Sequence, residues 1–474
     1  MRPLPLTPES VIKKSPFLVA RQISDNEVRV YSRLHGNMRS FGPEIFAVLK
    51  IFDSPVDVGS AVKELGEARS DAMAMIEELY GRRFLVDADQ AMEAMFAEYV
   101  DAARRNNEVP RVTKINFLVS ATCNLACQGC YHTFYDFKSQ DMDVGFADSV
   151  FKGLFPYLKR KGIPAALISF LGYEPFMNFE VMRDICSRAR HMGEKYAIDV
   201  TFKIFTNGFG FSDRMFDWLV QNKDRVSLKV SLDGIRADND RRRVDRSGAG
   251  TYDRVVANIG RILSAGVHCG VLIVLSKLNL PNIEKFVDEM AAMGVRHITA
   301  NIFCGQSDDE RKLELSEDEK LEAIRRMDLA TEKHGIEFDG EFKFAVLQMI
   351  TGAHFTCPAG LKQLVFCADG AIHPCQRFAG TRVNFGKYDN RFWDDLLAGE
   401  CQAYKDWNNE LYDGVMERIG GDNADLTGWS CPFIPFLRGQ CLSTNVERKF
   451  NERLLDYYIT RPIDRIISKS RIEC

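Results

Sequence analysis

Three cysteines stand close together in the stretch SATCNLACQGCYHTF, at Cys123, Cys127 and Cys130. This spacing suits neither a disulfide nor a zinc finger. Three thiolates on one tight loop can hold three corners of a cubane iron–sulfur cluster and leave its fourth iron open. A zinc site would need a fourth protein ligand, and His132 is the nearby candidate. The structural setting of the loop therefore decides between the two metals.

The composition is that of a globular protein with two or three domains. The chain has 474 residues, 62 basic and 66 acidic, for a net charge of -4, which gives no whole-chain case for nucleic-acid binding. We find no apolar run long enough for a signal peptide or a membrane span, so we expect a cytoplasmic protein without a membrane partner. Thirteen cysteines in a reducing compartment indicate metal or redox chemistry rather than disulfides.

From residue 114 onward, short apolar strands alternate with amphipathic helices. Six such β-then-α units predict a parallel α/β sheet. Because no dinucleotide glycine fingerprint is present, a partial (β/α)6 TIM-like barrel over residues 111–345 fits better than a doubly wound sheet. The three cysteines follow the first strand, at the face where such barrels perform chemistry. The predicted strands cover residues 114–120, 165–172, 200–208, 226–234, 269–276 and 297–303.

The N-terminal region, residues 1–110, predicts a winged-helix domain and a connector. Between residues 17 and 89, short alternating strands precede three helices and a final apolar strand. Ser40 can cap the first helix and Pro43 sits in its first turn. A winged helix can bind DNA, but the second and third predicted helices carry few basic residues to neutralise phosphates. We therefore expect no nucleic-acid partner.

The region from 346 to 474 predicts an irregular third domain rich in cysteine, glycine and proline. In CPAGLKQLVFCADGAIHPC, Cys357 precedes a strand, Gly370 lies in a turn, and Cys375 falls on the returning strand. Such a hairpin brings distant thiols together. The later cysteines of this region are Cys401, Cys431, Cys441 and Cys474.

Two other features are typical of ordinary structure. The basic run RRRVDR at 241–246 is expected to be a solvated loop, although it could meet an acidic peptide or a cofactor carboxylate. Cys186, Cys269 and Cys304 lie in periodic helices or strands, so we expect them to be buried and unligated.

From residue 112 to about 305 the sequence resembles the radical S-adenosylmethionine (SAM) enzymes, whose signature is this cysteine spacing in a partial β/α barrel. LGYEPFMN matches the family's Gly-Gly-Glu-Pro element, with Tyr173 in place of the second glycine. FTNG at 205–208 and SLDG at 231–234 match the family's third and fourth strand ends, while Gly129 replaces the usual aromatic residue before the last cysteine. The resemblance implies that the following residues meet the cofactor: Gly172, Tyr173, Glu174, Thr206, Asn207, Ser231 and Asp233.

The resemblance also implies a reaction. The open iron of a [4Fe-4S] cluster binds SAM, and an electron from the reduced cluster cleaves the carbon–sulfur bond to give a 5'-deoxyadenosyl radical. An external electron donor such as flavodoxin or ferredoxin is implied as a partner. The protein orients the reactants and excludes side reactions, while the cofactors supply the difficult chemistry. The motifs assign no catalytic base.

The C-terminal region resembles the SPASM extension of radical SAM enzymes, or its shorter Twitch form, which binds auxiliary iron–sulfur clusters. Gly370 to Cys375 fits the Gly-x4-Cys hairpin of that extension, whereas Gly428 and Leu437 stand where a full SPASM run has cysteines. One auxiliary [4Fe-4S] cluster is assigned to Cys357, Cys375, Cys431 and Cys441. Further candidates, for a second auxiliary cluster, are Cys367, Cys401 and Cys474.

The winged segment at 17–89 resembles the PqqD-like peptide-recognition element of peptide maturases, the fold of the carrier protein in pyrroloquinoline quinone synthesis. In that element a leader peptide adds a strand to an exposed sheet edge, so that backbone hydrogen bonds give affinity and side-chain pockets give selectivity. The resemblance therefore implies a ribosomally made precursor peptide, or a small protein subunit with a leader, as partner.

The sequence thus predicts a radical SAM peptide maturase that installs a thioether or carbon–carbon crosslink. One group with this layout builds thioethers in the small subunit of quinohemoprotein amine dehydrogenase. The first alternative is an anaerobic sulfatase-maturase-like enzyme that oxidises Ser or Cys, but Gln376 stands where that family has an Asp base directly after the hairpin cysteine. The second is a noncatalytic iron–sulfur or zinc regulator with a winged DNA-binding head.

Overall fold

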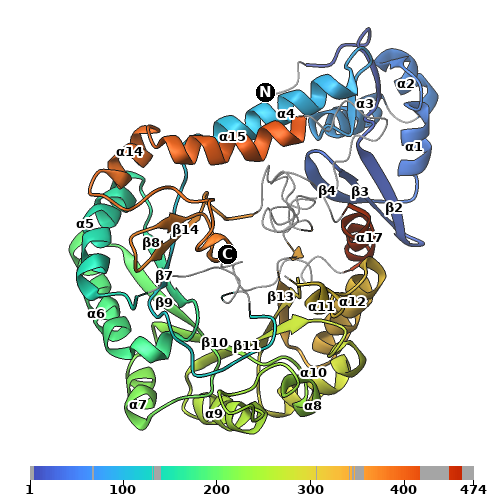
Figure 1. The fold of residues 1–474 in the computed structure, drawn as a ribbon. Coiled ribbons are helices and arrows are strands. Elements are labelled where there is room, and N and C mark those ends of the chain that lie inside the picture. Colours follow the sequence, from blue (N-terminus) through green and yellow to red (C-terminus); the bar gives the residue numbers. More distant parts are fainter. Residues whose placement is uncertain are drawn as a thin grey trace.

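The computed structural model describes residues 5–66, 69–130, 132, 140–305, 307–340, 342–343, 346, 357–416 and 448–461. The described elements follow one another around a ring (Figure 1). Barrel strands and their outer helices make up most of this ring, and the N-terminal sheets occupy one corner. Among the described helices, none is long and apolar enough to cross a membrane.

The N-terminal region contains two small antiparallel sheets and three helices; the three helices and the last strand agree with the sequence pattern, whereas the sheet that includes β1 was not predicted. The sheets have the orders β5-β1-β6 and β2-β3-β4, and the helices pack on them around an apolar core that includes Phe52 and Phe84. The elements are β1 (Val11–Lys14), β2 (Leu18–Ser24), β3 (Glu27–Ser32), β4 (Gly36–Phe41), β5 (Val56–Asp57), β6 (Leu85–Asp87), α1 (Ile45–Ile51), α2 (Val58–Leu65) and α3 (Arg69–Gly81).

The predicted cap of the first helix is wrong. Ser40 lies in β4 and its hydroxyl donates to Glu27, while α1 begins only at Ile45, so Pro43 precedes the helix instead of occupying its first turn. The Ser40 hydroxyl therefore bonds to Glu27 on the neighbouring strand β3 and does not cap α1. The second helix is capped as helices usually are, because the Asp57 side chain accepts a hydrogen bond from the backbone N–H of Ser60.

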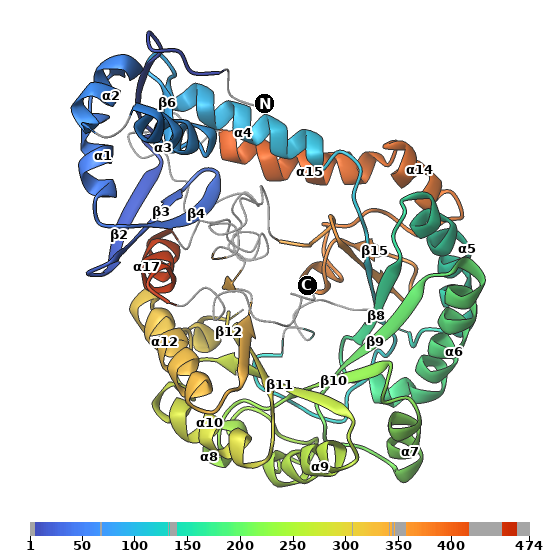
Figure 2. The ribbon, with the colours of Figure 1, turned by 180° about the vertical axis from the view of Figure 1, so that it is seen from behind.

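The partial barrel is confirmed. Six strands pair in parallel in chain order, and their connecting helices cover the outside of the sheet (Figure 2). The strands are β7 (Lys114–Leu118), β8 (Ala165–Leu171), β9 (Asp199–Thr206), β10 (Val226–Ser231), β11 (His268–Leu275) and β12 (His297–Ile302). The helices on the outside are α5 (Val144–Arg160), α6 (Phe179–Tyr196), α7 (Asp213–Gln221), α9 (Tyr252–Ser264), α10 (Ile283–Ala292) and α12 (Glu317–Lys333).

The barrel sheet extends further than the sequence suggests. Beyond β12 lies β13 (Glu337–Gly340), and on the other side β14 (Gln363–Cys367) pairs in parallel with β7, with Cys367 opposite Leu118. The returning strand β15 (Ile372–His373) completes the predicted hairpin, with Gly370 at φ 87° in its turn. Cys375 does not lie on this strand as expected, because the strand ends at His373 and Cys375 caps a short 3-10 turn. The hairpin therefore continues the barrel sheet, where we expected a separate irregular region. All five residues of β14 are buried. This agrees with its position in the sheet, where it lies between β7 and β15.

C-terminal helices connect the N-terminal region to the barrel. Helix α15 (Gln402–Met416) runs beside α4 (Met92–Asn106), and the hydroxyl of Tyr404 donates to the carbonyl oxygen of Asn107. Helix α17 (Arg448–Ile459) packs on α12, and the buried Arg29 of β3 donates to the carbonyl oxygen of Ile459 over 2.7 Å. The N-terminal sheets are thus joined to α17, the last described helix. The proposed domain boundaries at 110 and 345 remain predictions.

Candidate cluster and cofactor site

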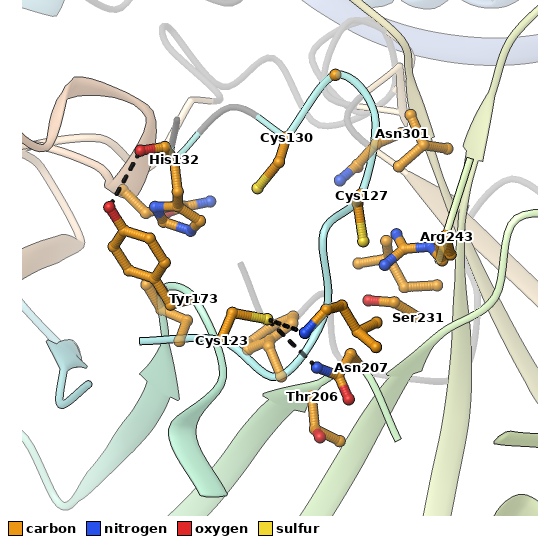
Figure 3. Close-up of a pocket in the computed structure, with 18 of the residues that line it drawn as sticks. Cys123, Cys127, Cys130, His132, Tyr173, Thr206, Asn207, Ser231, Arg243 and Asn301 are labelled. Atoms are coloured by element: carbon orange, nitrogen blue, oxygen red, sulfur yellow. Dashed lines mark hydrogen bonds between the residues drawn. The ribbon is translucent and has the colours of Figure 1, made fainter. Parts of the chain in front are cut away.

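A cavity of about 490 Å³ lies at the carboxyl ends of the barrel strands. The loop after β7, the ends of β8 to β12, the segment after β10 and the residues after β15 all contribute to its wall (Figure 3). The lining includes Lys114, Cys123, Cys127, Cys130, His132, Gly172, Tyr173, Thr206, Asn207, Ser231, Arg242, Arg243, Arg246, Asn301, Phe303, Cys304, Gln376 and Arg377.

The three cysteines of the loop all line this cavity, and their sulfur atoms point into it (Figure 3). Each is partly exposed. Burial raises the pKa of the Cys123 thiol to about 11, although the backbone N–H of Leu125 lowers it. Burial also raises the pKa of Cys127, while the nearby Arg243 guanidinium lowers it. Because metal binding needs thiolates, loading this loop would release protons.

The donor set fits an iron–sulfur cluster better than a zinc ion. In the described part of the chain, no three His, Cys, Asp or Glu side chains converge as single-ion ligands. A cubane does not need such convergence, because each thiolate binds a different iron. His132, the candidate fourth zinc ligand, is buried and stacks on Tyr173 with ring centroids 4.8 Å apart. The loop can therefore hold a cluster with one iron open to the cavity.

The ends of β8 and β9 meet behind the cysteine loop. Asn207 lines the cavity, and its side-chain amide donates to Asn124 over 2.7 Å and approaches the Cys123 sulfur at 3.5 Å. Glu174 was expected to face the cofactor, but it does not line the cavity. Its carboxylate is buried and accepts hydrogen bonds of 2.7 Å from both the Thr206 hydroxyl and the Asn207 backbone N–H. Burial raises the pKa of Glu174 to about 7, although these donors lower it.

The end of β8 also carries an unusual backbone. Gly172 has φ 85° and Tyr173 has φ 30°, a left-handed conformation that a tyrosine rarely adopts. A Cβ at Gly172 would lie 2.8 Å from the Leu118 side chain, so only glycine fits against β7. Both residues line the cavity, and Tyr173 contributes an aromatic ring where the family pattern has glycine; their contact with the cofactor stays a prediction.

The basic run at 241–246 is exposed only at its ends, Arg241 and Arg246, so the prediction of a solvated loop is wrong for its middle. Arg242 is buried, Arg243 is largely buried, and both line the cavity. They pair with Asp233, whose Oδ2 lies 2.8 Å from Arg243 Nε and 3.1 Å from Arg242 Nη1. Asp233 was expected to face the cofactor, but it lies behind the arginines, outside the cavity wall. Ser231 does line the cavity, and its contact with the cofactor stays a prediction.

The sequence pattern did not predict that residues at the end of β12 line the site. Asn301, Phe303 and Cys304 line the cavity, and Cys304 is partly exposed instead of buried as expected. A Cβ at Gly129 would lie 2.9 Å from the Phe303 ring. The aromatic ring absent before Cys130 is thus replaced in space by Phe303. The one available signal was that Phe303 directly follows a barrel strand.

The C-terminal cysteines have different surroundings. Cys357 is partly exposed, and Cys375 is buried with its sulfur 3.3 Å from the Arg377 backbone N–H. Cys367 is buried with Leu118, Leu171 and other apolar side chains, an environment that suits an unligated thiol. Cys401 is partly exposed. The remaining candidates, Cys431, Cys441 and Cys474, lie outside the described residues.

Residues 117–290 match the family model described as the Radical SAM superfamily. This region contains the cysteine loop and the strand ends that line most of the cavity. Over these residues the chain is therefore similar to radical SAM enzymes, a superfamily that uses SAM and a [4Fe-4S] cluster.

Two curated relatives match the barrel region. One is the uncharacterized protein MJ0907 of Methanocaldococcus jannaschii, 25% identical over 185 residues, which are 39% of this chain and 60% of that protein. The other is the serine-type anaerobic sulfatase-maturating enzyme of Bacteroides thetaiotaomicron, 26% identical over 165 residues, or 34% of this chain and 39% of that protein. The match thus spans less than two thirds of either relative.

Two solved structures share the fold over more of the chain. Native anSMEcpe with bound AdoMet and Cp18Cys peptide has a TM-score of 0.58 at 15% identity, over 75% of this chain and 98% of that one. Streptococcus suis SuiB bound to SAM has a TM-score of 0.51 at 15% identity, over 92% of this chain and all of that one. The similarity to SuiB thus reaches well beyond the barrel.

Proposed function

We propose that this protein is a radical SAM peptide maturase that installs a thioether or carbon–carbon crosslink in a precursor peptide or small protein subunit. The carrying observation is that the cysteine loop, the barrel strand ends and Gln376 and Arg377, which follow the SPASM-like hairpin, all line one cavity. A cavity of about 490 Å³ is of the size that small-molecule cofactor sites usually have. The proposal is further supported by the N-terminal sheets, which lie on the same ring as that cavity.

In this proposal the chain's own residues bind and orient the reactants. Cys123, Cys127 and Cys130 hold the cluster, while Asn207 and Ser231 present polar groups from two strand ends. When bound, the cluster and SAM supply the one-electron chemistry that removes a hydrogen atom from the substrate. Gly172 lets the β8 backbone approach the cofactor, because it has no side chain. Glu174 acts from behind: it fixes the Thr206 hydroxyl and the Asn207 backbone in place.

The N-terminal region is proposed to present the peptide at the edge of β4. Among the described strands, β4 pairs only with β3, and it is the strand of its sheet on the inner side of the ring (Figures 1 and 2). The opposite edge strand, β2, contacts α17 through Arg21 and Asp456. Phe46, on α1 just after β4, is 41% exposed. A leader strand on β4 would gain backbone hydrogen bonds, and we propose that the exposed Phe46 ring adds an apolar contact to the same peptide.

The hairpin is proposed to carry an auxiliary cluster through Cys357 and Cys375, with Cys431 and Cys441 as further ligands. Support comes from the position of the hairpin: β14 pairs with β7, and Gln376 and Arg377 reach the same cavity as the cysteine loop. An auxiliary centre there would stand close to the substrate. An external one-electron donor such as flavodoxin or ferredoxin completes the proposed set of partners.

The test is anaerobic reconstitution followed by an assay with SAM, a chemical reductant and a candidate precursor encoded beside the gene. We expect 5'-deoxyadenosine and a mass change in the peptide that fits a crosslink, a loss of two hydrogen atoms. About eight irons per chain would support two cubanes and about twelve would support three. Absence of 5'-deoxyadenosine from an iron-loaded chain that also shifts duplex DNA would instead favour the regulator.

Oxidation of a Ser or Cys side chain is the second candidate, because one curated relative is a sulfatase-maturating enzyme. In the resembling family an Asp base directly follows the hairpin cysteine. Here Gln376 stands in that place and lines the cavity, and an amide cannot accept a proton as a carboxylate does. A sulfatase-derived peptide converted to a formylglycine aldehyde would favour this candidate over crosslinking.

A further inference from the structure

The segment 242–246 lies against the cysteine loop as a short antiparallel bridge. The backbone N–H of Ala126 donates to the Val244 carbonyl oxygen over 2.8 Å, and that of Gln128 donates to the Arg242 carbonyl oxygen over 2.9 Å. Leu125 pairs with Asp245 across this bridge. We call residues 242–246 the strap. The part of the loop between Cys123 and Cys130 is therefore held by backbone contacts to a second segment.

Arginine side chains of the strap add to these contacts. Arg246 donates twice to the carbonyl oxygen of Cys123, from Nε over 2.9 Å and from Nη2 over 2.6 Å. Arg242 donates from Nε to the Gln128 carbonyl oxygen over 3.3 Å, and its guanidinium lies 4.7 Å from the centre of the Phe303 ring. Because Phe303 fills the space beside Gly129, the loop is held on this side by packing as well.

The strap is itself anchored in the barrel. Asp233, just after β10, pairs with Arg242 and Arg243, and its Oδ1 accepts a hydrogen bond of 2.9 Å from the backbone N–H of Val274 on β11. A buried carboxylate held in this way cannot move without breaking several contacts. The position of the cysteine loop is thus tied to two barrel strands through the strap.

The charges of the strap are unbalanced on the cavity side. Arg242, Arg243 and Arg246 line the cavity, and among the described lining residues there is no Asp or Glu. Asp233 offsets one of these three charges from outside the cavity wall, and the strap's own carboxylate, Asp245, does not line the cavity and bonds to Ser247 instead. A reduced cluster carries one more negative charge than an oxidised one, so nearby cations stabilise the reduced state.

We propose that the strap positions the cysteine loop for cluster binding and that its arginines favour the reduced form of the cluster held there. This inference rests on the proposed radical SAM function. It makes Arg246 a positioning residue, because it contacts the backbone carbonyl of a cluster ligand rather than the reacting atoms.

The test uses the full chain, reconstituted with iron and sulfide, in four forms: wild type, Arg246→Gln, Arg246→Lys and Arg241→Gln. Arg241 belongs to the same basic run, but it is exposed and does not line the cavity, so it is the matched control. Two quantities are measured: the midpoint potential of the cluster in an electron paramagnetic resonance titration, and the rate of iron loss to a chelator.

We expect Arg246→Gln to lower the ratio of reduced to oxidised cluster at fixed potential roughly threefold to tenfold, a tenfold change being about 59 mV for one electron. This shift should shrink as salt is raised, because Arg246 is exposed. Arg246→Lys keeps the charge but loses the two-pronged contact, so its potential should stay near wild type while iron leaves faster. Arg241→Gln should match wild type in both measurements.

Two outcomes overturn the inference, and they can be told apart. If the wild type holds a four-iron cluster and cleaves SAM, but Arg246→Gln equals it in potential and iron loss, the strap has no such role and the proposed function stands. If the reconstituted wild type holds no such cluster, the proposed function and this inference fail together.

Discussion

The ring of Tyr173 lies stacked on the imidazole of His132, with centroids 4.8 Å apart and planes inclined by 22°. The Tyr173 hydroxyl also donates to the His132 carbonyl oxygen over 3.2 Å. Tyr173 keeps these contacts at a φ of 30°, a backbone strain that costs about 1 kcal/mol or more in a residue other than glycine. The contacts hold the chain two residues beyond Cys130, so Tyr173 stabilises the end of the cysteine loop.

Replacing Tyr173 separates strain from contact. Tyr173→Gly relieves the backbone strain but removes the stack, so we expect faster iron loss from the reconstituted cluster. Tyr173→Phe keeps the ring and loses one hydrogen bond, worth about 1 kcal/mol, and should retain iron nearly as wild type does. If the glycine variant held iron as well as the phenylalanine variant, the stack would have no part in supporting the loop.

The buried pair of Asp233 with Arg243 and Arg242 predicts a large effect on stability. Asp233→Asn leaves two guanidinium groups without their counter-ion, so we expect the free energy of unfolding to fall by about 3–5 kcal/mol in a denaturant titration. The control is Asp213→Asn, which breaks an exposed ion pair of 2.7 Å with Arg261 and should cost about 1 kcal/mol or less. Equal losses in the two variants would contradict the account.

The same pair predicts a pH dependence. Burial alone would raise the pKa of Asp233, but Arg243 and Arg242 outweigh it and hold the pKa below its ordinary value. The native carboxyl therefore releases its proton more readily than the unfolded one. The pair adds stability above the ordinary pKa of aspartate, and this is lost as the pH falls through the lowered native pKa. In Asp233→Asn this part of the acid-induced loss should disappear.

The cysteine loop predicts a selective loss of chemistry. Replacing Cys123, Cys127 and Cys130 together with Ala should abolish 5'-deoxyadenosine formation and remove about four irons per chain. The fold should survive, since all three thiols are partly exposed. Cys186→Ala is the control, because that thiol is buried on α6 away from the cavity. Unchanged 5'-deoxyadenosine formation by the triple variant would refute the radical SAM role of the loop.

Replacing the hairpin cysteine Cys375 should affect peptide modification and leave SAM cleavage intact. We expect Cys375→Ala to lose iron beyond that of the first loop and to stop peptide modification, while SAM cleavage continues. The reason is that Cys375 follows the hairpin strand β15, whereas the first loop follows β7. Cys367→Ala is a close control, because that thiol is packed among apolar side chains. Full peptide turnover and full iron content in Cys375→Ala would remove the auxiliary cluster.

The sequence predicts what depends on local pattern. The alternation of strands and helices and the order of the strand-end motifs are local, and they were enough to place Cys123, Asn207 and Ser231 at one face. Long-range pairing is different. Strand β14 pairs with β7 across more than two hundred residues, and neither segment has a sequence feature that identifies the other as its partner. The charge pattern of RRRVDR likewise cannot show that Asp233 lies beneath it. The contact between Phe303 and Gly129 is also long-range, so the sequence pattern could not predict it.

The most exposed prediction concerns the edge of β4, where we expect a leader peptide to bind. Removing the N-terminal region is a poor test, because Arg29 holds α17 and Asn107 holds α15. A point change avoids this problem. Phe46→Ser removes an exposed ring from α1, which begins four residues after β4, and should weaken binding of a fluorescent leader peptide by about 1–2 kcal/mol, roughly tenfold in Kd.

The matched control for Phe46→Ser is Leu329→Ser, which removes a similarly exposed apolar side chain from α12 and should leave leader binding unchanged. Formation of 5'-deoxyadenosine without peptide should be the same in both variants and in wild type, because the cysteine loop is untouched. Only the yield of modified peptide per 5'-deoxyadenosine should fall in Phe46→Ser, since remote binding energy holds the target hydrogen in place. Equal yields in the two variants would show that the leader does not bind beside Phe46, and duplex DNA binding by the same region would then support the regulator.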